Sequence, residues 1–175
     1  AVNHVRALNS LSALDARTVL DAVGLGAAHL IARTIDIPKG ASGFEEALGA
    51  FRAHYGSHQG TCSRTYPGVR DMLAALAGEF DLYVLSNKPH EATVREIDIQ
   101  GLSGFFRDIF GGGRLPALKP DPAGVLEALR SSGLDPSRGA MVGDLIVDMQ
   151  TGSSAGVSLF LVTWGFARPL VGFDG

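Results

Sequence analysis

Three groups of polar residues in this sequence have types and spacings suited to phosphate chemistry. They are, in chain order, Ser86 with Asn87, Lys119, and Asp144 with Asp148. A hydroxyl and an amide N–H can bind phosphoryl oxygens, and an ammonium group can neutralise the charge that develops on them. Paired carboxylates supply the hard oxygen ligands that Mg²⁺ prefers. The combination predicts a Mg²⁺-dependent phosphoryl-transfer site.

Each group taken alone also has a structural explanation. Ser86 or Asn87 could simply cap the helix that follows, and Asp144 could cap another, with Asp148 as a solvated acid in its first turn. A lysine such as Lys119 is usually a solvated surface group. However, the chain has twelve arginines and only three lysines, so a lysine at this position is not generic surface filler. The ordered set of all three groups favours the catalytic interpretation.

The elements that must position these residues alternate strand with helix. Apolar runs predict strands over 80–85, 108–110, 140–142 and 159–163, and helical stripes predict helices over 69–76, 89–100, 122–129 and 145–155. Strands separated by such helices need crossover connections, which produce a parallel sheet covered on both faces. Chemistry in such sheets collects at the carboxyl ends of the strands. We therefore predict a doubly wound α/β core over residues 66–175.

The first 65 residues carry helical patterns and almost no strand signal. The clearest helix is expected over 43–55, where apolar residues recur on one face at Phe44, Ala47, Leu48, Phe51 and Tyr55. Asp15 is placed to cap a second, shorter helix. Pro67 and Gly68 interrupt the chain where the pattern changes. The sequence thus predicts an all-helical cap over residues 1–65, joined to the core by a hinge.

The same motifs resemble the haloacid dehalogenase-like phosphohydrolases, and within them the phosphoglycolate phosphatase-like branch. The segments LYVLSNKP, GGGRLPALKPDP and MVGDLIVD look like the family's second, third and fourth motifs, and TYPGVRDML looks like its return from cap to core. The resemblance implies a Rossmann-like core with an inserted cap. It also implies hydrolysis of a small phosphomonoester through an aspartyl-phosphate, with 2-phosphoglycolate the leading candidate and Mg²⁺ the cofactor. Ser86, Asn87 and Lys119 would be the catalytic and substrate-binding groups, and Asp144 and Asp148 the metal ligands.

The sequence departs from the family in one major respect. The family's nucleophile is the first aspartate of an Asp-x-Asp-x-Thr motif after the first strand, and these 175 residues contain no such motif. We expect about 20 further residues upstream of Ala1, carrying that strand and motif. A further strand and helix are expected after Gly175. Without the first strand, two edges of the sheet would have no partner. A milder departure is Leu145, where the family commonly has serine.

Other functions remain open at this point. Within the family, a sugar phosphomutase, a pyrophosphatase or a dehalogenase is possible, although the acidic pair disfavours a metal-independent dehalogenase. Outside it, a non-catalytic binding module would explain the missing nucleophile. A phospho-accepting receiver domain is disfavoured because its acidic pair comes first in the chain, whereas here the pair comes last.

The composition of the chain excludes some classes of binding partner. The net charge is −3 with both signs interleaved, and no basic patch or long apolar stretch is present, so we expect neither nucleic acid nor a membrane as partner. Cys62 is the only cysteine, which excludes an internal disulfide and fits a cytoplasmic protein. The expected partner is a small phosphorylated metabolite, bound by a monomer or homodimer. His54 and His58 lie four apart, but without a third ligand they do not predict a metal site.

Overall fold

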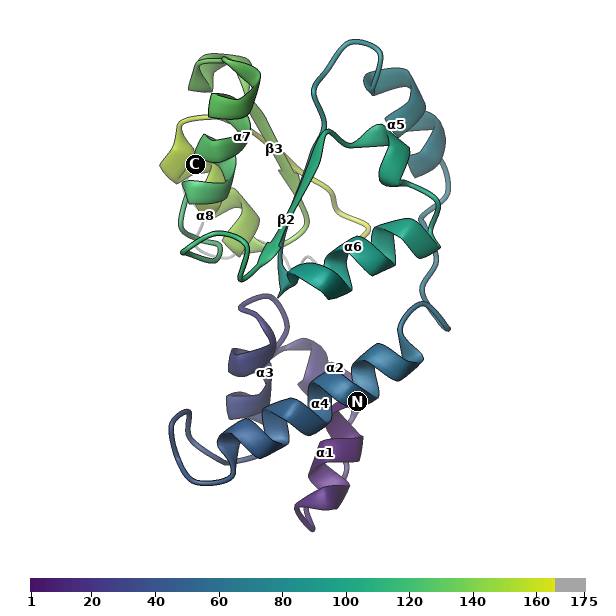
Figure 1. Cartoon of the computed structure of the whole chain (residues 1–175), viewed down its shortest axis with the longest axis vertical. Coiled ribbons are helices and arrows are strands. Elements are labelled where there is room, and N and C mark those ends of the chain that lie inside the picture. The colour runs from purple at the N-terminus through teal and green to yellow at the C-terminus, as the bar shows by residue number, and fades with distance from the viewer. Residues whose placement is uncertain (166–175) are drawn as a thin grey trace.

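The structure is a computed structural model, and it describes residues 1–165. Four helices come first, and strands and helices then alternate (Figure 1). The helices are α1 (Val2–Leu8), α2 (Ala16–Leu20), α3 (Ala27–Thr34), α4 (Phe44–His58), α5 (Val69–Leu76), α6 (His90–Ile99), α7 (Ala123–Ser132) and α8 (Ile146–Ala155). The strands are β1 (Tyr83–Pro89), β2 (Asp108–Gly112), β3 (Ala140–Gly143) and β4 (Ser158–Leu161). Short 3₁₀ helices cover Ser103–Phe105 and Pro136–Arg138.

Helices α1 to α4 have a hydrophobic core of their own. Its buried members come from α1, α3, α4 and the residue after α3, and they are Val5, Ile31, Ile35, Phe44, Ala47 and Leu48. The predicted stripe of α4 supplies half of them. Asp15 caps α2 as expected, because its carboxylate accepts a hydrogen bond from the Thr18 N–H at 2.9 Å. A separate cluster of Leu129, Met141, Ala155 and Val157 lies among the strands and their helices. We refer to α1 to α4 as the helical group; a domain boundary near residue 65 stays a prediction.

Three histidine rings are in contact where α1 meets α4, one pair stacked and the other tilted, and we call them the histidine stack. The ring centroid of His54 lies 4.1 Å from that of His4 and 4.3 Å from that of His58. The Nδ1 atom of His54 is buried and has no hydrogen-bond partner. Desolvation of the ring, together with the repulsion that His4 and His58 would exert on a second charge, holds the pKa of His54 below its ordinary value of 6.5.

This stack predicts a loss of stability in mild acid. The unfolded chain takes up a proton on His54 near pH 6.5, whereas the folded protein resists it until a lower pH, so stability falls as pH drops below 6.5. We expect the melting temperature to fall between pH 7.5 and 5.5, and His54→Gln to reduce that fall. The matched control is His29→Gln in α3, outside the stack. An equal fall with pH in the parent and in His54→Gln would contradict the prediction.

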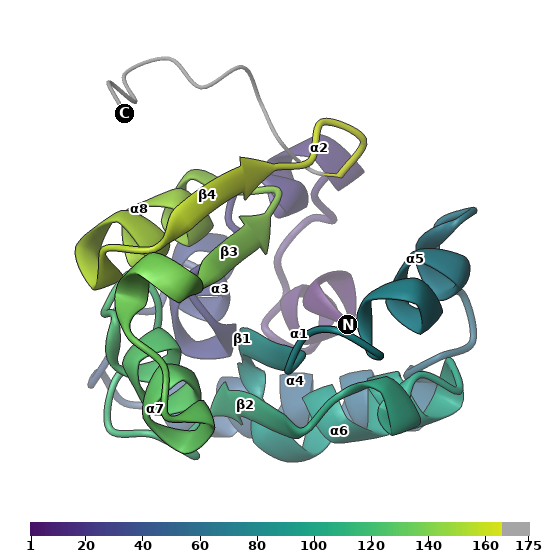
Figure 2. The same cartoon turned by 90° about the horizontal axis from the view of Figure 1, so that it is seen from above.

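The four strands form two parallel pairs, which Figure 2 shows as separate. In the first pair Tyr83 lies opposite Asp108, and in the second Ala140 lies opposite Ser158. The parallel α/β architecture is therefore confirmed. Within residues 1–165, each of the four strands has one edge without a strand partner.

The bounds of all four strands differ from the prediction, by one or two residues in β2 and β3 and by more in β1. The first strand was expected over 80–85, but it begins at Tyr83 and continues to Pro89, because pairing with β2 extends to Gly112 with a register shift after Leu85. Phe80 is 57% exposed, outside the strand. The last strand was expected over 159–163 and ends instead at Leu161, where its pairing with Gly143 ends. Hence Ser86 and Asn87 lie within the end of β1 rather than after it.

The helices after residue 68 attach to particular strands. Helix α6 packs on β1 and β2, α8 packs on β3 and β4, and α7 contacts both β1 and α8. This arrangement brings the carboxyl end of β1 toward the segment before α7 and the start of α8. In the part of the chain that the structure describes, no helix is both long enough and apolar enough to cross a bilayer.

Candidate active site

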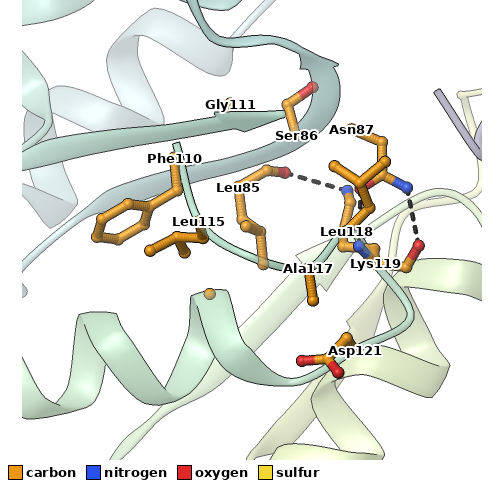
Figure 3. A pocket seen from close by; sticks show the side chains of 11 residues that line it. Leu85, Ser86, Asn87, Phe110, Gly111, Leu115, Ala117, Leu118, Lys119 and Asp121 are labelled. Atoms are coloured by element: carbon orange, nitrogen blue, oxygen red, sulfur yellow. Dashed lines mark hydrogen bonds between the residues drawn. The ribbon is translucent and has the colours of Figure 1, made fainter. Parts of the chain in front are cut away.

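A pocket lies at the carboxyl end of β1, beside the segment that leads into α7 (Figure 3). Three of the predicted site residues, Ser86, Asn87 and Lys119, line this pocket. The lining residues are Leu85, Ser86, Asn87, Phe110, Gly111, Leu115, Ala117, Leu118, Lys119, Asp121 and Gly124. The structure thus brings together residues more than thirty positions apart at the edge of the sheet where the chemistry was expected.

Asn87 and Lys119 are joined by two hydrogen bonds. The Lys119 backbone N–H donates to Asn87 Oδ1 at 2.8 Å, and Asn87 Nδ2 donates to the Lys119 carbonyl at 2.9 Å. Asn87 Nδ2 also donates to the Gly24 carbonyl at 2.9 Å. Both N–H bonds of the side-chain amide are therefore used by backbone carbonyls. The side-chain amide therefore has no free N–H for the predicted contact with phosphate, so that contact would need the backbone N–H of Asn87.

Lys119 is not a surface lysine. Its ammonium donates to Asp148 Oδ1 at 2.6 Å and to the Leu85 carbonyl at 3.0 Å. The side chains of this ion pair are only 12% and 5% exposed. The other oxygen of Asp148 accepts the backbone N–H groups of Asp144 at 3.1 Å and Leu145 at 3.0 Å. A buried ion pair with further hydrogen bonds at a strand end can hold a positive charge in a fixed place.

Gly143 is required by the position of Asp148. A Cβ atom built on Gly143 would lie 2.3 Å from Asp148 Cβ and 2.5 Å from Asp148 Oδ2. Such distances are far inside van der Waals contact. The absence of a side chain therefore allows the carboxylate to approach the end of β3.

A substitution at Gly143 tests this packing. Gly143→Ala should lower the free energy of unfolding by about 1–3 kcal/mol, because the new methyl group must displace the Asp148 carboxylate or the backbone. Gly49→Ala is the matched control, since a Cβ there meets nothing within 4 Å and lies inside helix α4. That change should leave stability within about 1 kcal/mol or raise it. Urea unfolding measures both; equal midpoints for Gly143→Ala and the parent would refute the steric argument.

Ser86 is the predicted site residue that the structure places apart from the others. Its Oγ accepts the backbone N–H of Lys88 at 3.1 Å. In Figure 3 its hydroxyl points away from the Lys119 side chain, on the opposite side of β1 from the Asn87 side chain. The structure therefore joins Asn87, Lys119 and Asp148 directly, and leaves Ser86 at the rim.

The donor chemistry at the ends of β3 and α8 fits a magnesium ion in part. Asp144 and Asp148 offer carboxylate oxygens, and Mg²⁺ commonly takes one or two carboxylates while keeping waters or substrate phosphates as its other ligands. Asp148 already holds Lys119 and two backbone N–H groups, so a metal ion would share this carboxylate with them. Across residues 1–165, no three His, Cys, Asp or Glu side chains are grouped to hold a metal by themselves.

Sequence reasoning missed one contributor to the site, the loop at Gly24 between α2 and α3. The carbonyl of Gly24, in the segment Gly24-Leu25-Gly26, accepts a hydrogen bond from Asn87 Nδ2. The two closely spaced glycines are the sequence signal for this loop, and in the structure their φ values are positive, +125° and +90°.

Comparisons with known proteins place this arrangement in a family. The family model described as haloacid dehalogenase-like hydrolase matches residues 1–162. A phosphoglycolate phosphatase of Cupriavidus necator is 30% identical over 172 residues, which cover 97% of this chain and 74% of that protein. A phosphoglycolate phosphatase of Aquifex aeolicus is 36% identical over 125 residues, which cover 71% of this chain and 59% of that protein.

A solved structure supports the same assignment. The crystal structure of a predicted phosphoglycolate phosphatase from Haemophilus somnus superposes with a TM-score of 0.89 at 28% identity, covering 97% of this chain and 79% of that one. Sequence and fold therefore agree over nearly the whole chain, and the resemblance drawn from the three motifs is confirmed. The chain belongs to the haloacid dehalogenase-like hydrolases, an enzyme family, and within them to the phosphoglycolate phosphatase-like branch.

Proposed function

We propose that the protein hydrolyses small phosphomonoesters, with 2-phosphoglycolate as the leading candidate substrate. The observation that carries the proposal is the buried Lys119–Asp148 ion pair at the strand ends, held by Asn87. The names of the relatives from Cupriavidus necator and Aquifex aeolicus support the choice of substrate.

In this proposal one group of residues binds the phosphoryl oxygens and another binds the metal ion. The Lys119 ammonium offsets the negative charge of the phosphoryl oxygens, and the Ser86 hydroxyl and the Asn87 backbone N–H donate hydrogen bonds to them. Asp144, with Asp148 as the second predicted ligand, would hold Mg²⁺. A bound Mg²⁺ supplies a positive charge that polarises the phosphoryl group.

The proposal also requires a carboxylate nucleophile that these 175 residues do not provide in an Asp-x-Asp-x-Thr motif. Attack of that carboxylate on phosphorus would break the bond to the ester oxygen and form an aspartyl-phosphate, which water then hydrolyses to phosphate. The helical group, whose Gly24 loop lies over Asn87, would exclude bulk water and select the substrate.

The test is phosphate release by the intact protein with Mg²⁺ present. The substrate panel contains 2-phosphoglycolate, several three-carbon and sugar phosphates, pyrophosphate and a generic aryl phosphate. We expect the highest kcat/KM with 2-phosphoglycolate and loss of turnover on chelation of the metal. Preference for a sugar phosphate or for pyrophosphate would replace the proposed substrate, and no release from any member would refute the proposed function.

A further inference from the structure

One buried side chain connects three segments that are distant in sequence. Asn87 lies at the end of β1 and is 7% exposed. Its amide bonds both backbone polar groups of Lys119 and, at 2.9 Å, the carbonyl of Gly24 in the helical group. The three bonds use both N–H groups of the amide. The Asn87 side chain is therefore bonded both to the Gly24 loop of the helical group and to Lys119 of the core.

The Gly24 loop is shaped to make this contact. A Cβ atom on Gly24 would lie 3.1 Å from Leu145 Cδ1, and one on Gly26 would lie 3.3 Å from the Asn87 carbonyl oxygen. Both glycines have positive φ values, which side chains disfavour. A side chain at either position would strain the loop that brings the Gly24 carbonyl against β1.

On the core side, Asn87 is bonded to the residue that carries the positive charge of the site, Lys119. Asn87 fixes both the N–H and the C=O of Lys119, and the ammonium of the same residue reaches Asp148 and the Leu85 carbonyl. If the Gly24 loop leaves, a buried N–H of Asn87 loses its acceptor. An unmatched buried donor is costly, so the amide and the Lys119 backbone must then rearrange or admit water.

We propose that Asn87 is a positioning residue that couples docking of the Gly24 loop on the core to the placement of Lys119. Its role in catalysis rests on the proposed function, whereas the coupling itself does not. Docking of the helical group would then complete the phosphate site as well as cover it. Because the coupling is an equilibrium property, it must act in both directions: a change at Gly24 is felt at Lys119.

Hydrogen exchange in the intact protein tests the coupling without any turnover. Asn87→Ala should raise amide exchange both in residues 21–26 and in residues 117–121. Gly24→Ala, which strains the loop, should also raise exchange in 117–121, and it should add little in an Asn87→Ala background. Thr93→Val is the matched control, because Thr93 is a buried residue of the same region whose hydroxyl bonds the carbonyls of Lys88 and Pro89. It should leave both segments unchanged.

Kinetics test the consequence for catalysis. With a generic aryl phosphate, Asn87→Ala should lower kcat about two- to tenfold, the range expected for one neutral hydrogen bond, with a smaller effect on KM. In a Lys119→Met background the same change should cost little more, because its effect passes through Lys119.

The outcomes separate the two claims. If Gly24→Ala leaves exchange in 117–121 unchanged, or if its effect adds fully to that of Asn87→Ala, the coupling is overturned. If the losses in kcat from Asn87→Ala and Lys119→Met multiply, the positioning role is overturned. If the parent protein releases no phosphate from any ester, the proposed function fails while the exchange experiment still decides the coupling.

Discussion

Replacing Lys119 by methionine is expected to lower phosphate release by the intact protein about a hundred- to a thousandfold at saturating Mg²⁺. The ammonium is a fixed donor in a poorly solvated pocket, and removal of one such donor to a developing oxyanion costs about 2.7–4 kcal/mol of transition-state stabilisation. Lys119→Arg should not restore activity, because a guanidinium is broader and cannot take the position of a point charge. Steady-state hydrolysis of 2-phosphoglycolate measures the effect.

The same substitution leaves Asp148 as an uncompensated buried charge, which typically costs about 3–5 kcal/mol of stability. A double variant with Lys119→Met and Asp148→Asn separates the two effects, since it removes that charge. It should recover much of the stability and none of the activity. The matched control is Lys39→Met, at an exposed lysine between α3 and α4. A folded Lys119→Met protein within threefold of the parent would end the phosphate-site assignment.

The second large effect is expected at the acidic pair. Asp144→Asn should raise the Mg²⁺ concentration needed for half-maximal activity by about a hundredfold or more, because even partners behind a metal ligand are worth 10–100-fold in affinity. Mg²⁺ titration of the hydrolysis rate measures this, and calorimetric titration of the protein with Mg²⁺ gives an independent reading. An amide keeps the size of the side chain and removes its charge, so the fold should be retained.

Asp135→Asn controls for the loss of one negative charge, because Asp135 is an exposed residue before the 3₁₀ helix at Pro136–Arg138. Its Mg²⁺ requirement should equal that of the parent. If Asp144→Asn also shows the parental Mg²⁺ dependence, Asp144 does not bind the metal. A shift seen only with Asp148→Asn would move the assignment to the residue that pairs with Lys119.

Local patterns in the sequence predict much of this molecule. The apolar stripe of α4 and the sharp breaks around Pro67 and Gly68 mark the helices and the change of architecture, because helical periodicity is a local property. The spacing of Asp144 and Asp148 at a strand end is likewise a local pattern, and their role as an acidic pair in the site stays a prediction. Gly143 precedes this pair. The structure shows why a glycine is needed there: a Cβ atom would collide with the Asp148 carboxylate.

What could not be predicted depends on contacts between distant segments. The true end of β1 is set by pairing with β2, which no local pattern records. The contact of Asn87 with Gly24 joins residues 63 positions apart, and the histidine stack brings His4 against His54. Ser86 and Asn87 were expected to act together, but neighbouring residues of a strand point to opposite sides, and only Asn87 faces Lys119.

The two unpaired edges of β1 and β3 bear on the handling of this protein in solution. An unpaired parallel strand presents a row of N–H and C=O groups that any extended segment can pair with, including the same edge of another copy. Val142 and Phe160, on paired positions of β3 and β4, are 59% and 57% exposed and add an apolar surface beside one edge. The part of the chain that the structure describes therefore carries a template for aggregation, and dilute solution favours the monomer.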